Sequence, residues 1–202
     1  QERRARDRAG FRARLDAIDP ALIPERDRVS LEVLRFALDE ADLAWEHRSF
    51  LAPTDPLWGI HQTVARLAAG LPLQRPRDFE LYVERVARVP DWVDDGVARM
   101  RQGIAEGRTH PRVIMEGITG QIDGMLGPGG LDPVREPLAR IPDSMPEERQ
   151  AALTERMETE LLPAIRAALQ RYRDFFAGEY LPACRPTIAA TEWPDGDAWY
   201  AG

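Results

Sequence analysis

Side chains that could bind a metal ion are few in this sequence and lie far apart. The histidines are His47, His61 and His110, and the single cysteine is Cys184. A zinc site on a helix usually needs two histidines four residues apart, with an acidic residue beside the first. None of the three histidines has that spacing. We therefore predict that this chain alone holds no metal and no cofactor.

Nucleophilic and phosphate-binding patterns are also absent from the sequence. Cys184 lies between two prolines without the flanking residues of a thiol enzyme, which favours a structural thiol. There is no Gly-x-Ser-x-Gly segment and no glycine-rich loop that follows a strand. Adjacent carboxylates fall on polar faces or first turns of expected helices, where they favour the helix dipole. We predict no catalytic residue in this chain.

The aromatic residues near the C-terminus are the best candidates for contact with a ligand. Trp193, Trp199 and Tyr200 flank a Pro-Asp-Gly segment, which is typical of a turn because proline presets φ and glycine tolerates positive φ. The three side chains either pack the turn onto the protein or line a substrate cleft. Each can bury roughly 150–250 Å², so at least one should pack against the helices. Ending the chain at Gly202 should then leave an apolar patch and favour self-association.

The composition is that of an ordinary folded protein of 202 residues, 44% apolar and 30% charged. The net charge of −7 argues against a nucleic-acid partner. Arginines are nevertheless concentrated at the start of the chain, where they form either a phosphate-binding arm or the solvated face of a helix: Arg3, Arg4, Arg6, Arg8, Arg12 and Arg14.

The cellular location stays open. No apolar run approaches the roughly 20 residues of a membrane span, so we expect no membrane partner. No apolar stretch follows the first arginines, so a signal peptide is not evident. Gln1 in place of methionine suggests that the natural chain begins upstream, and the protein could be cytoplasmic or exported.

Helical spacing of apolar residues dominates the whole sequence, which predicts an all-α protein. Helices are expected over residues 2–18, from 24, from 55 to 70 with Asp55 as the N-cap, over 77–88, over 93–104 and from 111 onward. A Ser144 capping box should start a long final helix that reaches residue 181, with a kink near Thr159 and Pro163. We expect an irregular multi-helix array that forms a single helical unit over residues 1–202.

Three glycines on one expected helix need a structural or functional reason. Gly117, Gly120 and Gly124 are spaced by three and four residues, and each costs about 1 kcal/mol relative to alanine. Either another backbone approaches this face closely, or the face is a groove for an extended ligand.

Several ordered segments resemble the N-terminal half of the bacterial family called domain of unknown function 885. The segments are Asp55-Pro56-Leu57-Trp58, residues 79–90, residues 103–113, Gln121-Ile122-Asp123, Tyr180-Leu181-Pro182-Ala183 and residues 193–200. Their order and spacing fit from about residue 50 to the end, whereas residues 1–49 fit only by helical character.

The resemblance implies a larger helical fold similar to zinc carboxypeptidase-like and dipeptidase-like enzymes. The zinc ligands of such a protein would lie beyond Gly202, in a downstream half that would be the main partner of this chain, and zinc would bind only in the full-length protein. The leading hypothesis is a scaffold that forms one wall of the cleft for a peptide substrate. The alternative is a non-catalytic helical domain that binds a protein or peptide.

Overall fold

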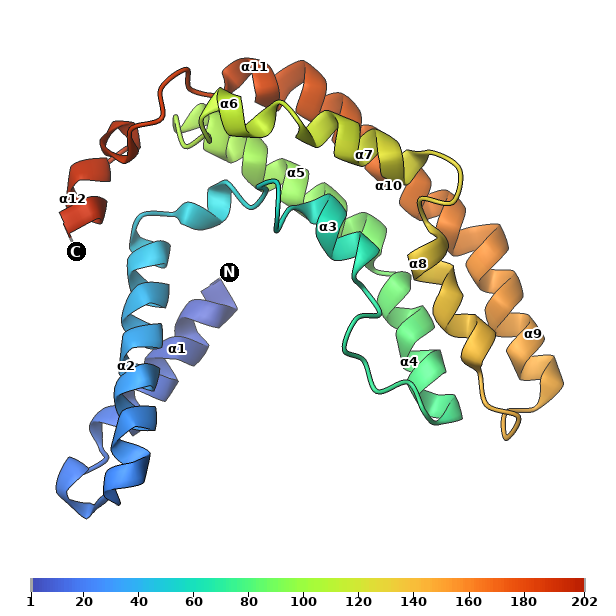
Figure 1. Ribbon diagram of the computed structural model, residues 1–202, viewed down its shortest axis with the longest axis horizontal. Coiled ribbons are helices and arrows are strands. Elements are labelled where there is room, and N and C mark those ends of the chain that lie inside the picture. Colours follow the sequence, from blue (N-terminus) through green and yellow to red (C-terminus); the bar gives the residue numbers. More distant parts are fainter. Residues whose placement is uncertain (1, 202) are drawn as a thin grey trace. The chain divides into compact units, whose positions relative to one another are not determined.

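The structure is a computed structural model that describes residues 2–201, and its regular elements are helices (Figure 1). Within this range there is no β-strand, and one isolated bridge joins Pro111 to Arg185. The predicted all-α class is therefore confirmed. None of the helices in the described range is both long and apolar enough to cross a membrane.

The chain forms two compact units. The first contains the described residues of Gln1–Phe50 and Ala189–Gly202, and the second contains Leu51–Ile188. The expectation of a single helical unit over residues 1–202 stays a prediction.

The first unit is built on a hairpin of two helices, α1 (Glu2–Asp16) and α2 (Glu25–Glu46), which run side by side (Figure 1). Helix α1 ends at Asp16, shortly before the expected stop at Asp19, and the Asp19 carboxylate accepts from the Ala21 amide at 2.9 Å, which caps the short η1 (Pro20–Leu22). The short η2 (Ser49–Leu51) follows α2 and ends at Leu51, the first residue of the second unit. The C-terminal part of the first unit contains η6 (Ala190–Glu192) and α12 (Gly196–Ala201). The buried core between α1 and α2 is small: Leu15, Leu31 and Leu38, with Ile23 packed against it.

Arginines of α1 pair with carboxylates of α2. Arg8 donates to Asp42 at 2.9 Å, and Arg12 contacts both Asp42 at 3.0 Å and Asp39 at 2.7 Å. The Arg8 guanidinium also lies 5.7 Å from the ring centre of Trp45. These contacts give two of the N-terminal arginines a role within the fold. The contacts favour the interpretation that the N-terminal arginines belong to a helix face over the interpretation that they form a phosphate-binding arm.

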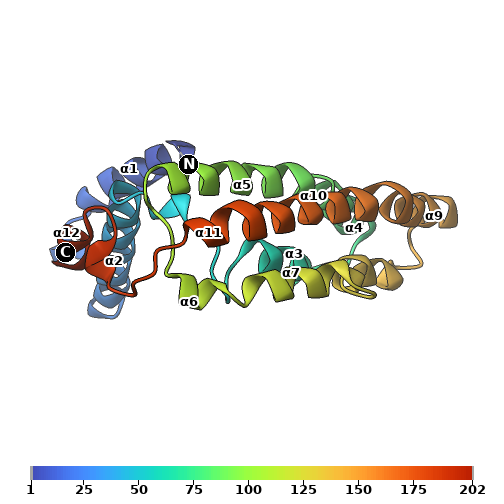
Figure 2. The same ribbon diagram turned by 90° about the horizontal axis from the view of Figure 1, so that it is seen from above.

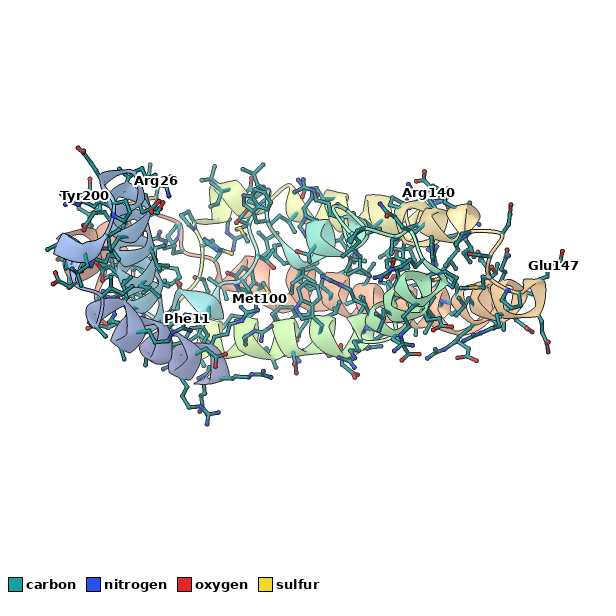
Figure 3. All side chains as sticks on the ribbon, turned by 90° about the horizontal axis from the view of Figure 1, so that it is seen from below. Phe11, Arg26, Met100, Arg140, Glu147 and Tyr200 are labelled. Carbon is teal, nitrogen blue, oxygen red and sulfur yellow. The ribbon has the colours of Figure 1, made fainter. Side chains whose placement is uncertain are left out.

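The second unit holds the remaining helices, and α10 lies between α5 and α7 (Figure 2). Met100 of α5 is fully buried and lies in the middle of these helices (Figure 3). The elements are α3 (Ile60–Ala65), α4 (Pro76–Val86), α5 (Val89–Ala105), α6 (Arg112–Met115), α7 (Ile118–Leu126), α8 (Asp132–Arg135), η3 (Glu136–Arg140), α9 (Glu147–Arg156), η4 (Met157–Leu161), α10 (Leu162–Phe175), η5 (Phe176–Tyr180) and α11 (Leu181–Ala183).

The predicted long helix is continuous from Glu147 to Ala183 and curves along its length (Figure 1). It contains two π-helical turns, η4 and η5, and each comes just before a Leu-Pro pair. The Leu162 amide donates to the Met157 carbonyl, five residues back, immediately before Pro163. A π turn re-routes the backbone bonds that a proline would otherwise break. Proline therefore distorts this helix without ending it.

Several sequence-based helix boundaries are wrong. The helix expected from residue 55 begins only at Ile60, because Asp55 caps a turn and Gly59 is extended with ψ 171°. The helix expected from residue 111 is interrupted between α6 and α7, which leaves Ile114 44% exposed and buries Met115 in its place. Helix α9 begins after Pro146 without a side-chain cap, so the expected Ser144 capping box does not form.

The glycine stripe on α7 is open. A Cβ atom added at Gly117, Gly120 or Gly124 would meet no atom within 4 Å. The interpretation that another backbone approaches this face closely is therefore wrong for the described residues. The alternative, a groove for an extended ligand, stays a prediction.

Candidate functional site

The C-terminal aromatic residues form a cluster in the first unit. Trp199 of α12 stacks on His47, which ends α2, with ring centres 5.6 Å apart and planes 13° from parallel. Trp193 meets Trp199 edge to face at 5.5 Å and is only 7% exposed. These contacts confirm the expectation that at least one of the aromatic residues packs against the helices.

The turn between the two tryptophans has the expected composition but an unexpected geometry. The Gly196 amide donates to the Trp193 carbonyl at 2.7 Å, which closes the turn. The positive φ falls on Asp195, at 62°, and not on the glycine. Gly196 is required for another reason, because its Cβ atom would lie 2.3 Å from the Ala190 carbonyl oxygen.

The cluster presents its outer edge to solvent. Tyr200 is 81% exposed and lies at the surface of its unit (Figure 3), and Trp199 is half-buried. Of the three predicted cleft residues, Trp193 therefore supports the cluster from inside, and Trp199 and Tyr200 are the two able to touch a ligand. A supported, exposed aromatic edge suits apolar side chains and peptide planes.

A second candidate site in the second unit begins with buried His61, on α3. Its Nε2 lies 2.6 Å from Oε1 of Gln121, on α7. Since that oxygen can only accept, Nε2 carries the proton. Nδ1 is buried without a hydrogen-bond partner among the described residues. Burial lowers the pKa of His61, and the bond to Gln121 only partly offsets this. His61 is therefore a neutral, structural histidine.

Other buried or half-buried polar groups fix the segment that precedes α3. The Tyr172 hydroxyl donates to Oγ1 of Thr54 at 3.0 Å. His110 Nε2 lies 3.1 Å from the Ala52 carbonyl, and the His110 amide donates to the Tyr180 hydroxyl at 3.4 Å. Burial lowers the pKa of His110 and raises the pKa of both tyrosines. These groups hold residues 52–54 in place.

The fixed segment leads into a loop with two exposed apolar side chains. Asp55 Oδ1 accepts from the amides of Leu57 at 2.7 Å and Trp58 at 2.8 Å, which forms a tight turn. Leu57 is 68% exposed and Trp58 is 71% exposed, with the Arg66 guanidinium 5.3 Å from the Trp58 ring centre. Sequence reasoning missed this surface because it placed these residues in a helix. An aspartate that can cap a tight turn, followed directly by leucine and tryptophan, was the sequence signal that could have indicated an exposed apolar loop.

A shallow pocket of mixed charge lies beside α8 and α9. It has a volume of about 560 Å³ and is lined by Asp132, Arg135, Glu136, Thr154 and Glu158, among others. Arg135 contacts Asp132 at 2.7 Å and Glu158 at 3.7 Å, so its charge is already compensated. Its lining residues come from two short segments, residues 132–139 and 154–158, and only the fold shows that these segments lie side by side.

The described residues do not fit a zinc ion. Across residues 2–201, no group of three histidine, cysteine or acidic side chains could hold a metal ion. Cys184 is buried, and burial raises the pKa of its thiol to about 11, so it stays protonated at neutral pH.

Several exposed carboxylates are engaged in ion pairs with arginines of neighbouring helices: Asp94 with Arg171, Glu179 with Arg101, Asp123 with Arg173 and Glu84 with Arg156.

Comparison with known proteins identifies a family. A family model described as a bacterial protein of unknown function, DUF885, matches residues 1–202. The match extends over residues 1–49, which resembled the family only by helical character. No curated protein and no solved structure matches the chain.

Proposed function

Because the chain belongs to the bacterial DUF885 family, we propose that it is the helical N-terminal scaffold of a zinc-dependent peptidase. In this proposal it forms one wall of the peptide cleft, and a downstream half of the same protein supplies the zinc ligands. The family resemblance implies a fold similar to zinc carboxypeptidase-like and dipeptidase-like enzymes, and this implied similarity supports the reaction class. The described residues contain no suitable metal-ligand group, so this chain would bind and orient the peptide.

The exposed aromatic edge is the observation that carries the proposed role in the cleft. Tyr200 is mostly exposed, and Trp199 is held by the rings of His47 and Trp193. A ring whose orientation is already fixed loses little entropy when it stacks on a peptide. Trp199 and Tyr200 would therefore contact apolar side chains of the substrate, and Trp193 would support them.

The proposal is tested with a short fluorescent peptide of alanine and phenylalanine. We expect Tyr200→Ala to weaken peptide binding to this chain about fivefold, because one aromatic contact is worth about 1 kcal/mol. Trp92→Ala, on α5, is the control, since Trp92 is 37% exposed and lies far along the sequence from this edge. Equal binding by Tyr200→Ala and the unmodified chain would contradict the role in the cleft.

Activity tests the peptidase part separately. We expect this chain to leave the peptide intact even with added zinc, and the full-length protein to cleave it in a chelator-sensitive reaction. In the full-length protein Tyr200→Ala should raise KM more than it lowers kcat, because the residue contributes binding and not chemistry. Cleavage by this chain alone would contradict the proposal that this chain binds the peptide and that the downstream half supplies the zinc ligands.

The alternative function is a non-catalytic domain that binds a protein or peptide. The observation that favours it is the hydrogen-bonded turn at Asp55, which presents the exposed side chains of Leu57 and Trp58. If this alternative holds, Trp58→Ala should weaken peptide binding more than Tyr200→Ala does. The full-length protein should then bind the peptide and leave it uncleaved.

A further inference from the structure

Helix α2 has two apolar faces, and α1 covers one of them. Leu31 and Leu38 are buried in the core of the hairpin. Val29, Val33 and Phe36 are spaced by four and three residues and lie on the opposite side of the helix. Their exposed fractions are 68%, 61% and 66%. We call the face formed by these three residues and Arg26, Ser30, Ala37 and Glu40 the outer face of α2; all seven residues are exposed.

The charges on the outer face are arranged symmetrically about Val33. Arg26 lies as many residues before Val33 as Glu40 lies after it. That separation is close to two helical turns, at about 3.6 residues per turn, so both charges lie on the same side as Val33. The outer face therefore has a positive end, an apolar middle and a negative end, and the exposed Arg26 at the positive end also lies 3.6 Å from the neighbouring Asp27 carboxylate.

We propose that the outer face of α2 binds the same face of a second copy of this chain, with the two helices antiparallel. A two-fold axis at Val33 would place Arg26 of each copy opposite Glu40 of the other. The same axis pairs Phe36 with Ser30 and Val29 with Ala37. Each large side chain then faces a small one, as close packing of helices requires.

Self-complementarity is the reason to choose a second copy as the occupant. In a parallel pair Arg26 would face Arg26 and Glu40 would face Glu40, which repel. In the antiparallel pair the charges attract and the side-chain sizes match in the same register. A helix of this length extends about 33 Å, so its one face buries less than the roughly 800 Å² per partner of a standard interface. The dimer should therefore be weak and should depend on protein concentration.

Sedimentation velocity of the whole chain tests the proposal through charge reversal. Over about a hundredfold range of concentration we expect the unmodified chain to shift from monomer towards dimer. Arg26→Glu alone and Glu40→Arg alone should each remain monomeric, because like charges would then face each other twice in the pair. An equimolar mixture of the two variants should dimerise again, since each substituted side chain would face the other and the unmodified Arg26 and Glu40 would still meet. A merely destabilised helix could not produce that rescue.

Arg28→Glu is the matched control. Arg28 is exposed on the same helix, but it lies off the outer face, so its reversal should leave dimerisation unchanged. Arg26→Glu and Arg28→Glu both add an acidic residue near the start of α2, where the helix dipole favours it, and far-UV circular dichroism should be unaltered. A chain that stays monomeric at every concentration would overturn the proposal. Failure of the mixture to dimerise would also overturn it, and either result would mean that something else covers this face.

Discussion

The two compact units are stabilised in different ways. The first unit has a thin core of three leucines, and much of the contact between α1 and α2 comes from Arg8, Arg12 and Asp42. The second unit has one continuous apolar core that runs from α3 to α11. It also buries polar groups such as His61 beside that core.

This difference determines which changes each unit should resist. A thin core gains little from burial, so exposed ion pairs carry a larger share of its stability and salt screens them. A thick core tolerates salt but responds strongly to lost volume and to protonation of a buried base. Each prediction below changes one of these contributions.

Truncation of the core should have the largest effect, and it should be larger in the second unit. Ile165→Ala removes a fully buried side chain of α10 and should lower the free energy of unfolding by about 4 kcal/mol. Leu31→Ala should cost about 2 kcal/mol, because a thin core can collapse around the missing atoms. Urea unfolding followed by circular dichroism gives both values.

The same experiment tests whether residues 1–202 behave as one helical unit. A single unit predicts one cooperative transition, which both variants move to lower urea. Two transitions, each moved by only one variant, would mean that the units unfold independently. Equal costs for the two variants would contradict the contrast between a thin and a thick core.

The sequence predicted the helices better than it predicted their ends and partners. Apolar spacing located α2, α4 and α5 because each buries one continuous stripe. Asp55 was predicted to cap a helix, but the same carboxylate caps a tight turn equally well, and only the packing around Gly59 decides between the two. The proline rule located the distortion near Pro163, but the π turn that absorbs it depends on neighbouring helices.

The buried polar contacts could not be predicted from the sequence for a different reason. His61 and Gln121 are 60 positions apart in the chain, and no local pattern connects them. The same holds for Tyr172 and Thr54, 118 positions apart. Among the cleft candidates, turn chemistry and aromatic content identified Trp193, Trp199 and Tyr200, but only the fold shows that Trp193 is buried. The periodicity of apolar residues predicts which face of a helix is buried, but it does not predict which residues of other helices that face contacts.

Acidification should destabilise the second unit through its histidines. Burial lowers the pKa of His61 and His110 below the unfolded value of about 6.5. As the pH falls through that value the unfolded chain binds protons that the folded chain does not, so the free energy of unfolding decreases. Each such proton changes it by about 1.4 kcal/mol per pH unit. Above about pH 7 the contribution should vanish, because both states are then neutral.

His61→Gln isolates one of these histidines. The glutamine amide can still donate to Gln121, but it does not titrate. Thermal unfolding between about pH 7.5 and 5 should therefore show a shallower pH dependence for the variant than for the unmodified chain. An unchanged slope would mean that His61 titrates normally in the folded protein.

Alanine at two glycines should have opposite effects within the second unit. A Cβ atom at Gly103 would lie 2.6 Å from the Leu51 carbonyl oxygen, so Gly103→Ala should cost about 2 kcal/mol through overpacking. The space around Gly120 is open, so Gly120→Ala should stabilise by about 0.5 to 1 kcal/mol. Melting temperatures measure both changes. If Gly120→Ala destabilised the chain, the open face of α7 would need another explanation.

The smallest expected effect is the loss of an exposed charge in the first unit. Hydrogen bonds from Arg8, and then from Arg12, lower the pKa of Asp42, and burial partly opposes them. Asp42→Asn should cost about 0.5 kcal/mol at low salt, in the range of exposed ion pairs. At about 1 M salt the cost should nearly vanish, because the Debye length falls to about 3 Å. Leu31→Ala in the same unit should keep its full cost at that ionic strength, since hydrophobic burial is not screened.

Asp123→Asn, which removes the partner of Arg173 in the second unit, is the matched comparison. There the thick core should leave the melting temperature almost unchanged at either salt concentration. Equal losses from the two asparagine variants at low salt would mean that ion pairs contribute alike to both units.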